Sequence, residues 1–270
     1  MVSSMSEAVL TAVFDRVGII TMNRPERRNA VNGALAAGLD AAVKAMAADD
    51  SVKVVVLTGA APEGGTGGFC SGGDTKSGDG DRAGMELGVP SAALEGDLTR
   101  HDTQAAMNLH LMPKPSIAMI GGPAVGAGCS LAAACDLRIA SEDAVFMAGF
   151  LPNGLSGDYG GTFFWTRIAG TAVARRLYLL NERLTAPQAL AFGMVHEVVP
   201  AAELRTFTLE MADRLARVPR ELLALVKDNL NRAEDEPDRR RFLFANECEN
   251  QRASGERMRE RLMQRSRPPT

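Results

Sequence analysis

The chain of 270 residues has few of the residues that bind metal ions or form disulfide bonds. Its four cysteines show no C-x-x-C spacing and no pair of histidines lies near them; they are Cys70, Cys129, Cys135 and Cys248. This pattern argues against a zinc site and against a framework of disulfide bonds. We therefore expect no bound metal, and a reducing cytoplasm is the expected location.

The chain also lacks an excess of basic charge and a long apolar run. Lys and Arg number 30 against 33 Asp and Glu, which gives a formal net charge of −3, so we expect no nucleic-acid partner. No apolar run approaches the roughly 18 residues that a membrane-spanning helix needs. The first residues have no basic stretch followed by an apolar core, which argues against a signal peptide. We therefore expect no membrane partner.

Strands and helices are predicted to alternate over the first 200 residues. Apolar, β-branched runs predict strands over 9–14, 17–22, 52–59, 116–120, 137–140, 144–147 and 194–200. Helical spacing of apolar residues predicts helices over 32–49, 102–112 and 185–193, with a glycine-rich turn entering a helix over 121–136. From residue 201 onward the pattern is helical and amphipathic. This order predicts an α/β core over 1–200 and a helical region over 201–270.

Glycine-rich loops over 64–74 and 121–136 follow β-branched strands. Backbone N–H groups at such turns suit a bound anion. A phosphate-binding P-loop needs Lys where this chain has Asp74, and a dinucleotide-binding fingerprint needs Gly where it has Leu131. The loops therefore indicate an anion site built from the backbone, and not a nucleotide site.

The stretch GFCSG, over 68–72, matches the turn that presents a nucleophile in some hydrolases. Cys70 would be the nucleophile and His196 a late member of its triad. A long acidic stretch follows Cys70 where that fold needs a helix, so a small buried cysteine is the other interpretation. His110 and His196 are expected to be structural, whereas the role of His101 stays open.

Five segments occur together in one order and spacing. They are IITMNRPERRNAVN (19–32), VVLTGAAPEGGTGGFCSGGD (55–74), KPSIAMIGGPAVGAGCSLAAACDLRIAS (114–141), YGGTFFWTRIAG (159–170) and LTAPQALAFGMVHEVV (184–199). Taken jointly, they resemble the crotonase (enoyl-CoA hydratase/isomerase) family over about residues 8 to 230. The resemblance implies a crotonase-like spiral of β-β-α turns with a C-terminal helical subdomain that makes trimer contacts, in a trimer or hexamer. It also implies acyl-CoA thioester substrates, with no cofactor beyond the coenzyme A of the substrate.

The resemblance further implies an oxyanion hole of two backbone N–H groups, which by position belong to Gly73 and Ala127. Such fixed donors stabilise the negative charge that develops on a thioester carbonyl oxygen. Arg24 and Arg28 match the loop expected to meet the phosphates of coenzyme A. Other substrate-binding residues are expected in the same motifs: Ala30, Phe69, Ser71, Asp74, Phe150 and Tyr159.

The chain departs from the family pattern where hydratases carry two glutamates. Those positions fall on Ser130 and Phe150, and neither residue can supply the pair of carboxylates that adds water to a double bond. We therefore expect no ordinary hydratase activity, and Ser130 remains a minor catalytic candidate.

Asp158 lies eight residues after Phe150. At the matching position, dienoyl-CoA isomerases have an Asp that moves protons, and 4-chlorobenzoyl-CoA dehalogenase has an Asp that attacks the aromatic ring. The histidine position of the dehalogenase falls on Thr103, two residues after His101. A carboxylate among apolar residues suits proton transfer near neutral pH, whereas the alternative is that Asp158 caps a helix beginning near Gly160.

The sequence thus predicts an acyl-CoA isomerase or lyase with Asp158 as its acid and base. Two further functions stay open at this stage. One is a dehalogenase or hydrolase that forms an aspartyl ester, and the other is a homologue that binds acyl-CoA without catalysis.

Overall fold

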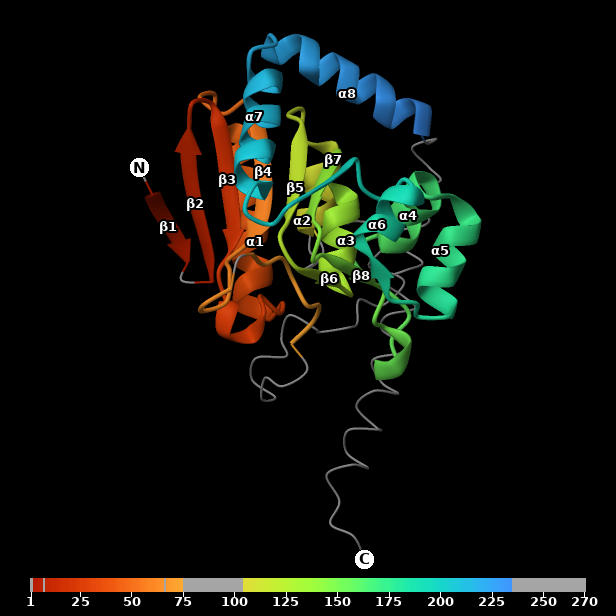
Figure 1. Cartoon of the computed structure of the whole chain (residues 1–270). Coiled ribbons are helices and arrows are strands. Elements are labelled where there is room, and N and C mark those ends of the chain that lie inside the picture. The colour runs from red at the N-terminus through yellow and green to blue at the C-terminus, as the bar shows by residue number, and fades with distance from the viewer. Residues whose placement is uncertain (1, 7, 66, 75–103, 235–270) are drawn as a thin grey trace, which may run out of the picture.

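The computed structural model describes residues 2–6, 8–65, 67–74 and 104–234 (Figure 1). Predictions that concern His101, Thr103, the acidic stretch over 75–98 and the chain after residue 234 lie outside the described residues. Within them, two sheets and the helices around them form the α/β arrangement that the sequence predicts.

The larger sheet begins with an antiparallel part and continues as a parallel one. Its strand order is β1-β2-β3-β4-β5-β7-β10. The first two pairs, β1-β2 and β2-β3, are antiparallel, and the following pairs are parallel. Asp15 and Arg16, with φ of 44° and 70°, make the tight turn between β2 and β3. The strands are β1 (Val2–Ser6), β2 (Val9–Phe14), β3 (Val17–Met22), β4 (Val54–Gly59), β5 (Ser116–Ile120), β7 (Leu137–Ser141) and β10 (Glu197–Val199).

Helices cover both faces of this sheet, and alternating side chains of each strand supply the two faces. In β4, Val55 and Leu57 belong to the core cluster that includes α1 (Gly33–Ala48), α2 (Gln104–Leu111) and α3 (Ala127–Ala134). Val54 and Val56 belong to the opposite cluster, under α7 (Leu204–Ala216). Asn32 begins α1, since its side chain accepts the N–H of Leu35 at 3.0 Å.

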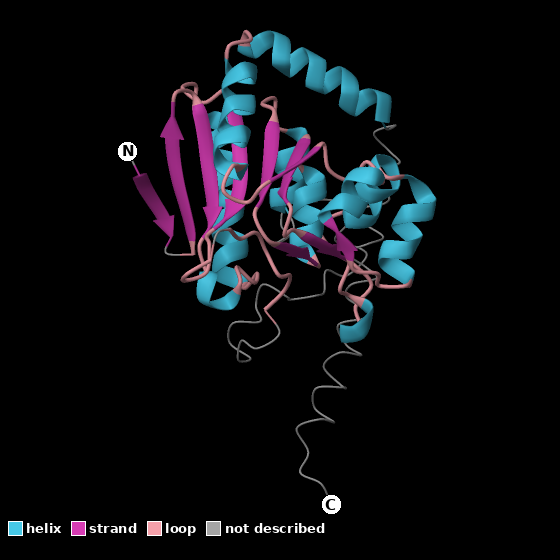
Figure 2. Cartoon of the chain, viewed as in Figure 1, coloured by secondary structure: helices cyan, strands magenta, loops and turns pink. Residues whose placement is uncertain are grey.

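A smaller sheet lies across one end of the larger one (Figure 2). Within the described residues it contains β6 (Pro123–Val125), β8 (Val145–Met147) and β9 (Leu184–Thr185) in that order. The sequence predicted only a turn where β6 lies, because three residues are too few to show a period. The order β5-β6-α3 is one turn of the expected β-β-α spiral.

The remaining described helices are α4 (Gly161–Ile168), α5 (Gly170–Leu179), α6 (Ala186–Ala191) and α8 (Arg220–Glu234), with two short 3₁₀ turns, η1 (Pro25–Arg27) and η5 (Leu151–Asn153). α6 has the predicted capping box, in which Gln188 Oε1 accepts the N–H of Thr185 at 2.9 Å. In the described part of the chain, no helix is both long and apolar enough to cross a bilayer. The division at residue 200 stays a prediction.

Candidate active site

Two glycine turns meet where the larger sheet reaches the smaller one. Gly72 has φ of 97° and Gly126 has φ of 54°. A Cβ atom on Gly126 would lie 3.3 Å from Gly72 Cα, and one on Gly72 would lie 3.0 Å from Val125 O. The N–H of Val125 donates to Cys70 O at 2.9 Å, which ties the two segments together. Only residues without side chains fit this close approach of two backbones.

The residues directly after these glycines lie at one cavity, and each has a backbone N–H group. Gly73 and Ala127 both line it, and neither N–H has an acceptor among the residues that the structure describes. Ala127 is the first residue of α3, so its N–H also carries the partial positive charge of a helix N-terminus. Two N–H groups that face one ligand can stabilise an anionic oxygen, and the resemblance implies this role for Gly73 and Ala127.

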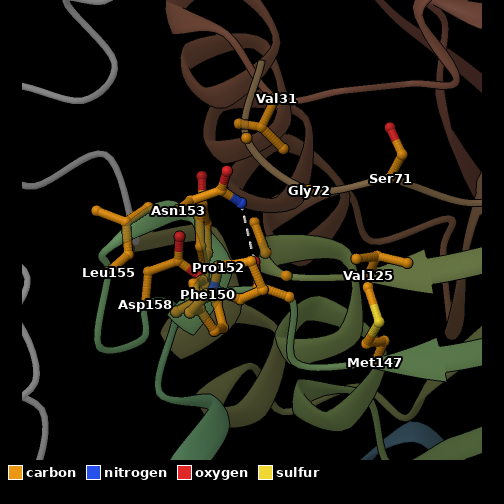
Figure 3. A pocket seen from close by; sticks show the side chains of 15 residues that line it. Val31, Ser71, Gly72, Val125, Met147, Phe150, Pro152, Asn153, Leu155 and Asp158 are labelled. Atoms are coloured by element: carbon orange, nitrogen blue, oxygen red, sulfur yellow. Dashed lines mark hydrogen bonds between the residues drawn. The ribbon is translucent and has the colours of Figure 1, made fainter. Parts of the chain in front are cut away.

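The cavity has a volume of about 260 Å³ and a mainly apolar lining. Figure 3 shows the lining side chains, which converge from the segments at 71–73, 125–127 and 147–159. One carboxylate, that of Asp158, belongs to the lining. The lining residues are Val31, Ser71, Gly72, Gly73, Val125, Gly126, Ala127, Met147, Gly149, Phe150, Pro152, Asn153, Leu155, Asp158 and Tyr159.

Asp158 lies on the loop between η5 and α4, and this loop has an unusual backbone. Gly157, Tyr159 and Gly160 have φ of 147°, 51° and 69°, and a left-handed conformation at a tyrosine costs roughly 1–2 kcal/mol. The Oδ1 atom of Asp158 is buried. The cap position of α4 belongs to Gly160, and Asp158 meets the helix through its main-chain carbonyl, which accepts the N–H of Gly161 at 3.1 Å. A strained loop that presents a carboxylate to a cavity is typical of a functional site.

An ion pair involves Asp74, the residue that follows Gly73. Arg24 Nη2 donates to Asp74 Oδ2 at 2.9 Å, and the two side chains are 13% and 4% exposed. Arg24 also donates through Nη1 to the carbonyl of Ala30. Val31, the residue after Ala30, pairs with the segment from Gly72 to Asp74. The N–H of Asp74 donates to Val31 O at 2.8 Å, and the N–H of Val31 donates to Gly72 O at 2.7 Å. The ion pair therefore fixes the backbone on both sides of Gly73.

The cysteine nucleophile considered from the sequence does not fit this site. Cys70 is fully buried, and burial, with a smaller contribution from the negative charge of Asp158, raises the pKa of its thiol to about 12. The nucleophilic thiolate is therefore absent near neutral pH. His196 is held in a structural contact, because its Nδ1 accepts the N–H of Arg138 at 3.1 Å. The described residues contain no cluster of three His, Cys, Asp or Glu able to hold a metal ion.

Comparison with known proteins places the chain in a family. The model of the enoyl-CoA hydratase/isomerase family matches residues 14–263. The chain belongs to the enoyl-CoA hydratase/isomerase family. It is 36% identical over 230 residues to 1,2-epoxyphenylacetyl-CoA isomerase of Escherichia coli (strain K12), covering 85% of this chain and 84% of the relative.

Two further relatives bear on the site and the fold. The chain is 30% identical over 225 residues to 4-chlorobenzoyl coenzyme A dehalogenase-1 of an Arthrobacter species, covering 82% of this chain and 77% of that one. The crystal structure of an enoyl-CoA hydratase from Mycobacterium avium subsp. paratuberculosis K-10 superposes with a TM-score of 0.77 and 29% identity, over 93% of this chain and 95% of the other. The fold is therefore the crotonase fold that the sequence predicts.

In this member of the enoyl-CoA hydratase/isomerase family, the cavity brings together six of the residues selected from the sequence. These are Ser71, Gly73, Ala127, Phe150, Asp158 and Tyr159. The other six do not line the cavity, for physical reasons that differ. Arg24, Ala30 and Asp74 are joined behind Gly73, whereas Arg28 is exposed to solvent on its loop.

The last two selected residues are buried in the core. Phe69 is 1% exposed and belongs to the main apolar cluster, where its ring is removed from water. Ser130 is fully buried in α3 and lies beside Gly161, where a Cβ atom would meet Ser130 Oγ at 2.3 Å and the Tyr178 hydroxyl oxygen at 2.1 Å.

The two positions at which the resemblance implies glutamates in hydratases carry no carboxylate in this chain. Phe150 occupies one, and its ring stacks on Tyr178 with centroids 6.0 Å apart. No sequence pattern indicated Val31, Met147, Asn153 or Leu155, which also line the cavity, because isolated residues of these types lie in every core and loop.

Proposed function

We propose that this protein is an acyl-CoA isomerase or lyase that stabilises a thioester enolate and moves a proton with Asp158. The observation that carries the proposal is the presence of one carboxylate and two backbone donors in a single apolar cavity. The family to which the chain belongs supports a thioester of coenzyme A as the substrate.

In the proposed reaction, the Asp158 carboxylate accepts a proton from a carbon activated by the thioester carbonyl. The electron pair of the broken C–H bond moves toward the carbonyl oxygen, which accepts hydrogen bonds from the N–H groups of Gly73 and Ala127. Each such donor is worth about 3–4 kcal/mol to the transition state. Asp158 then returns the proton to another carbon, so the double bond shifts and no atom is gained or lost. These groups need no cofactor beyond the coenzyme A of the substrate.

We propose that the acyl group contains a ring. Phe150 and Tyr159 form an aromatic wall of the cavity, and Met147 and Leu155 add flexible apolar surface. The names of two relatives, 1,2-epoxyphenylacetyl-CoA isomerase and 4-chlorobenzoyl coenzyme A dehalogenase-1, each denote an acyl group with a six-membered ring. Aromatic side chains favour such ligands through offset stacking and edge-to-face contacts.

A panel of acyl-CoA thioesters tests this function. Wild-type protein and the Asp158→Asn variant are incubated with each thioester, and the products are analysed by mass spectrometry and chromatography. We expect wild type to isomerise or cleave at least one ring-bearing thioester, and Asp158→Asn to bind it with similar affinity but to lose at least a thousandfold in turnover. Equal turnover by the two proteins would remove Asp158 from the chemistry, and tight binding without turnover by wild type would indicate a homologue that only binds acyl-CoA.

The dehalogenase relative supports a second candidate, in which Asp158 attacks a ring carbon and displaces halide, or attacks the acyl carbon and displaces the thiolate of coenzyme A. Water then attacks the carboxyl carbon of Asp158 and releases the product. A single turnover in water enriched in oxygen-18 separates the two. Proton transfer leaves the Asp158 carboxylate unlabelled, whereas hydrolysis of an aspartyl ester inserts one labelled oxygen into it.

We also propose a trimer, or a pair of trimers, with contacts from the region 201–270. α8 exposes an apolar stripe to solvent, at the helical spacing of one face, made of Leu222, Leu225, Val226 and Leu230. Light scattering tests this: the expected mass is three or six times that of one chain, and the mass of a single chain contradicts it.

A further inference from the structure

The turn that leads into Phe150 is held from both sides by asparagine side chains. Gly149 has φ of 69°, and its N–H donates to Asn181 Oδ1 at 2.7 Å. Its carbonyl accepts Asn153 Nδ2 at 3.0 Å, the bond drawn as a dashed line in Figure 3. Gly149, Phe150 and Asn153 line the cavity. The two amides therefore fix the backbone of the cavity wall at the point where it turns.

Asn181 lies just beyond the C-terminal end of α5, and its own backbone conformation suits this role. It follows the helix in the left-handed conformation, with φ of 49°, a position that after glycine favours asparagine. One turn earlier, Tyr178 stacks on the ring of Phe150 with an interplanar angle of 18°. The end of α5 thus holds both the backbone before Phe150 and the ring of Phe150 itself.

The Gly149 turn also packs closely against Val125 and Gly126, which directly precede Ala127. A Cβ atom on Gly149 would lie 2.8 Å from Val125 Cγ1 and 3.5 Å from Gly126 N, and the N–H of Gly126 donates to Met147 O at 3.1 Å. Movement of the Gly149 turn would therefore change the acyl cavity beside Ala127. Asn181 does not itself line the cavity.

We propose that Asn181 is a positioning residue that sets acyl-group specificity, because its side chain fixes the Gly149 turn and through it the Phe150 wall. The inference rests on the proposed function in one respect, that the cavity takes the acyl group of a thioester. It requires no particular chemical step.

Two substitutions separate the side chain of Asn181 from its backbone. Asn181→Gly keeps the left-handed conformation without strain but removes the acceptor. Asn181→Asp keeps an oxygen acceptor for the N–H of Gly149 and so should restore what glycine loses. A matched control is Asn231→Ala, since Asn231 Nδ2 also donates to a backbone carbonyl, that of His110 at 2.9 Å, from α8.

Binding by calorimetry is the readout, with phenylacetyl-CoA, butyryl-CoA and free coenzyme A as probes. We expect wild type to bind phenylacetyl-CoA more tightly than free coenzyme A. In Asn181→Gly this preference should fall about fivefold to tenfold, the equivalent of one hydrogen bond, while the affinity for free coenzyme A stays unchanged. Asn181→Asp and Asn231→Ala should keep the preference within about twofold. Thermal unfolding of each variant verifies that it is folded.

Three outcomes overturn the inference: an unchanged preference in Asn181→Gly, an equal loss in Asn181→Asp, or a wild type that does not distinguish phenylacetyl-CoA from free coenzyme A. Failure of the proposed function has a different signature. If wild type shows the preference and Asn181→Gly loses it, but no thioester is turned over, proton transfer by Asp158 is wrong and the role of Asn181 stands.

Discussion

Replacing Arg24 by Met should destabilise the fold strongly, because it leaves a buried carboxylate without its cation. The side chain of Asp74 is 4% exposed and that of Arg24 is 13% exposed, and their polar atoms are 2.9 Å apart. Removing one partner of such a buried pair costs about 3–5 kcal/mol. Arg24→Met also removes the bond to the carbonyl of Ala30. We expect unfolding in urea to occur at a clearly lower midpoint.

The double variant Arg24→Met/Asp74→Leu checks the cause, since it removes the stranded charge and should recover at least half of the lost stability. We also expect Arg24→Met to lower kcat as well as to raise KM, so that kcat/KM falls by a larger factor than the rise in KM alone would give. The reason is that the ion pair supports the segment that contains Gly73. A different result follows if Arg24 binds the phosphates of coenzyme A, as its position in the family motif suggested. Stability would then be unchanged within about 0.5 kcal/mol, and affinity for coenzyme A would fall.

Arg28→Met is the matched control for that competing role, because Arg28 is exposed and forms no part of the ion pair. We expect Arg28→Met to unfold at the same urea concentration as wild type. We expect it to lose affinity for coenzyme A, and to lose less affinity for 3′-dephospho-coenzyme A. An unchanged unfolding midpoint in Arg24→Met would refute the reasoning from burial.

Three further predictions concern residues around the site. Burial, with the nearby charge of Arg138, lowers the pKa of His196. The contribution of His196 to the free energy of unfolding should therefore be full above pH 6.5 and be lost as the pH falls below it, because the unfolded chain then takes up a proton that the folded chain resists. In urea unfolding between pH 7 and pH 5, His196→Asn should lose this dependence of the free energy of unfolding on pH. Cys70→Ala should keep at least a tenth of wild-type kcat, whereas a nucleophilic cysteine would leave none. Gly128→Ala should unfold at a lower urea concentration and lose turnover, because the added Cβ atom would lie 2.2 Å from Cys70 O. Such overpacking costs about 1–3 kcal/mol. An unfolding midpoint equal to that of wild type would contradict this close contact.

The fold could be predicted from the sequence wherever one element has a clear period. The hairpin over 9–22 and the strand over 116–120 were predicted with the bounds that the structure has. β6 and β9 have three and two residues, and such short segments show no alternation. They form strands because each pairs with β8, which is a tertiary effect.

The site was predictable where its chemistry comes from the backbone or from a rare residue in an unusual context. The glycine-rich loops indicated an anion site built from the backbone, the family resemblance selected Gly73 and Ala127 within them, and the isolated acid drew attention to Asp158; all three residues line one cavity. The role of Arg24 was not predictable, because an arginine in a polar loop has the same sequence pattern whether it faces a ligand or a carboxylate. Its partner lies fifty residues away along the chain.

Exchange of a substrate proton with deuterium oxide tests whether Asp158 moves a proton of the acyl group. Wild-type protein is incubated in deuterium oxide with a ring-bearing acyl-CoA that it binds, and deuterium in the acyl group is measured by mass spectrometry over time. We expect incorporation at the carbon next to the thioester carbonyl, or at the far end of a conjugated double bond. We expect Asp158→Asn to bind the same thioester and to incorporate deuterium about a thousandfold more slowly. Incorporation at the same rate in both proteins would contradict proton transfer by Asp158.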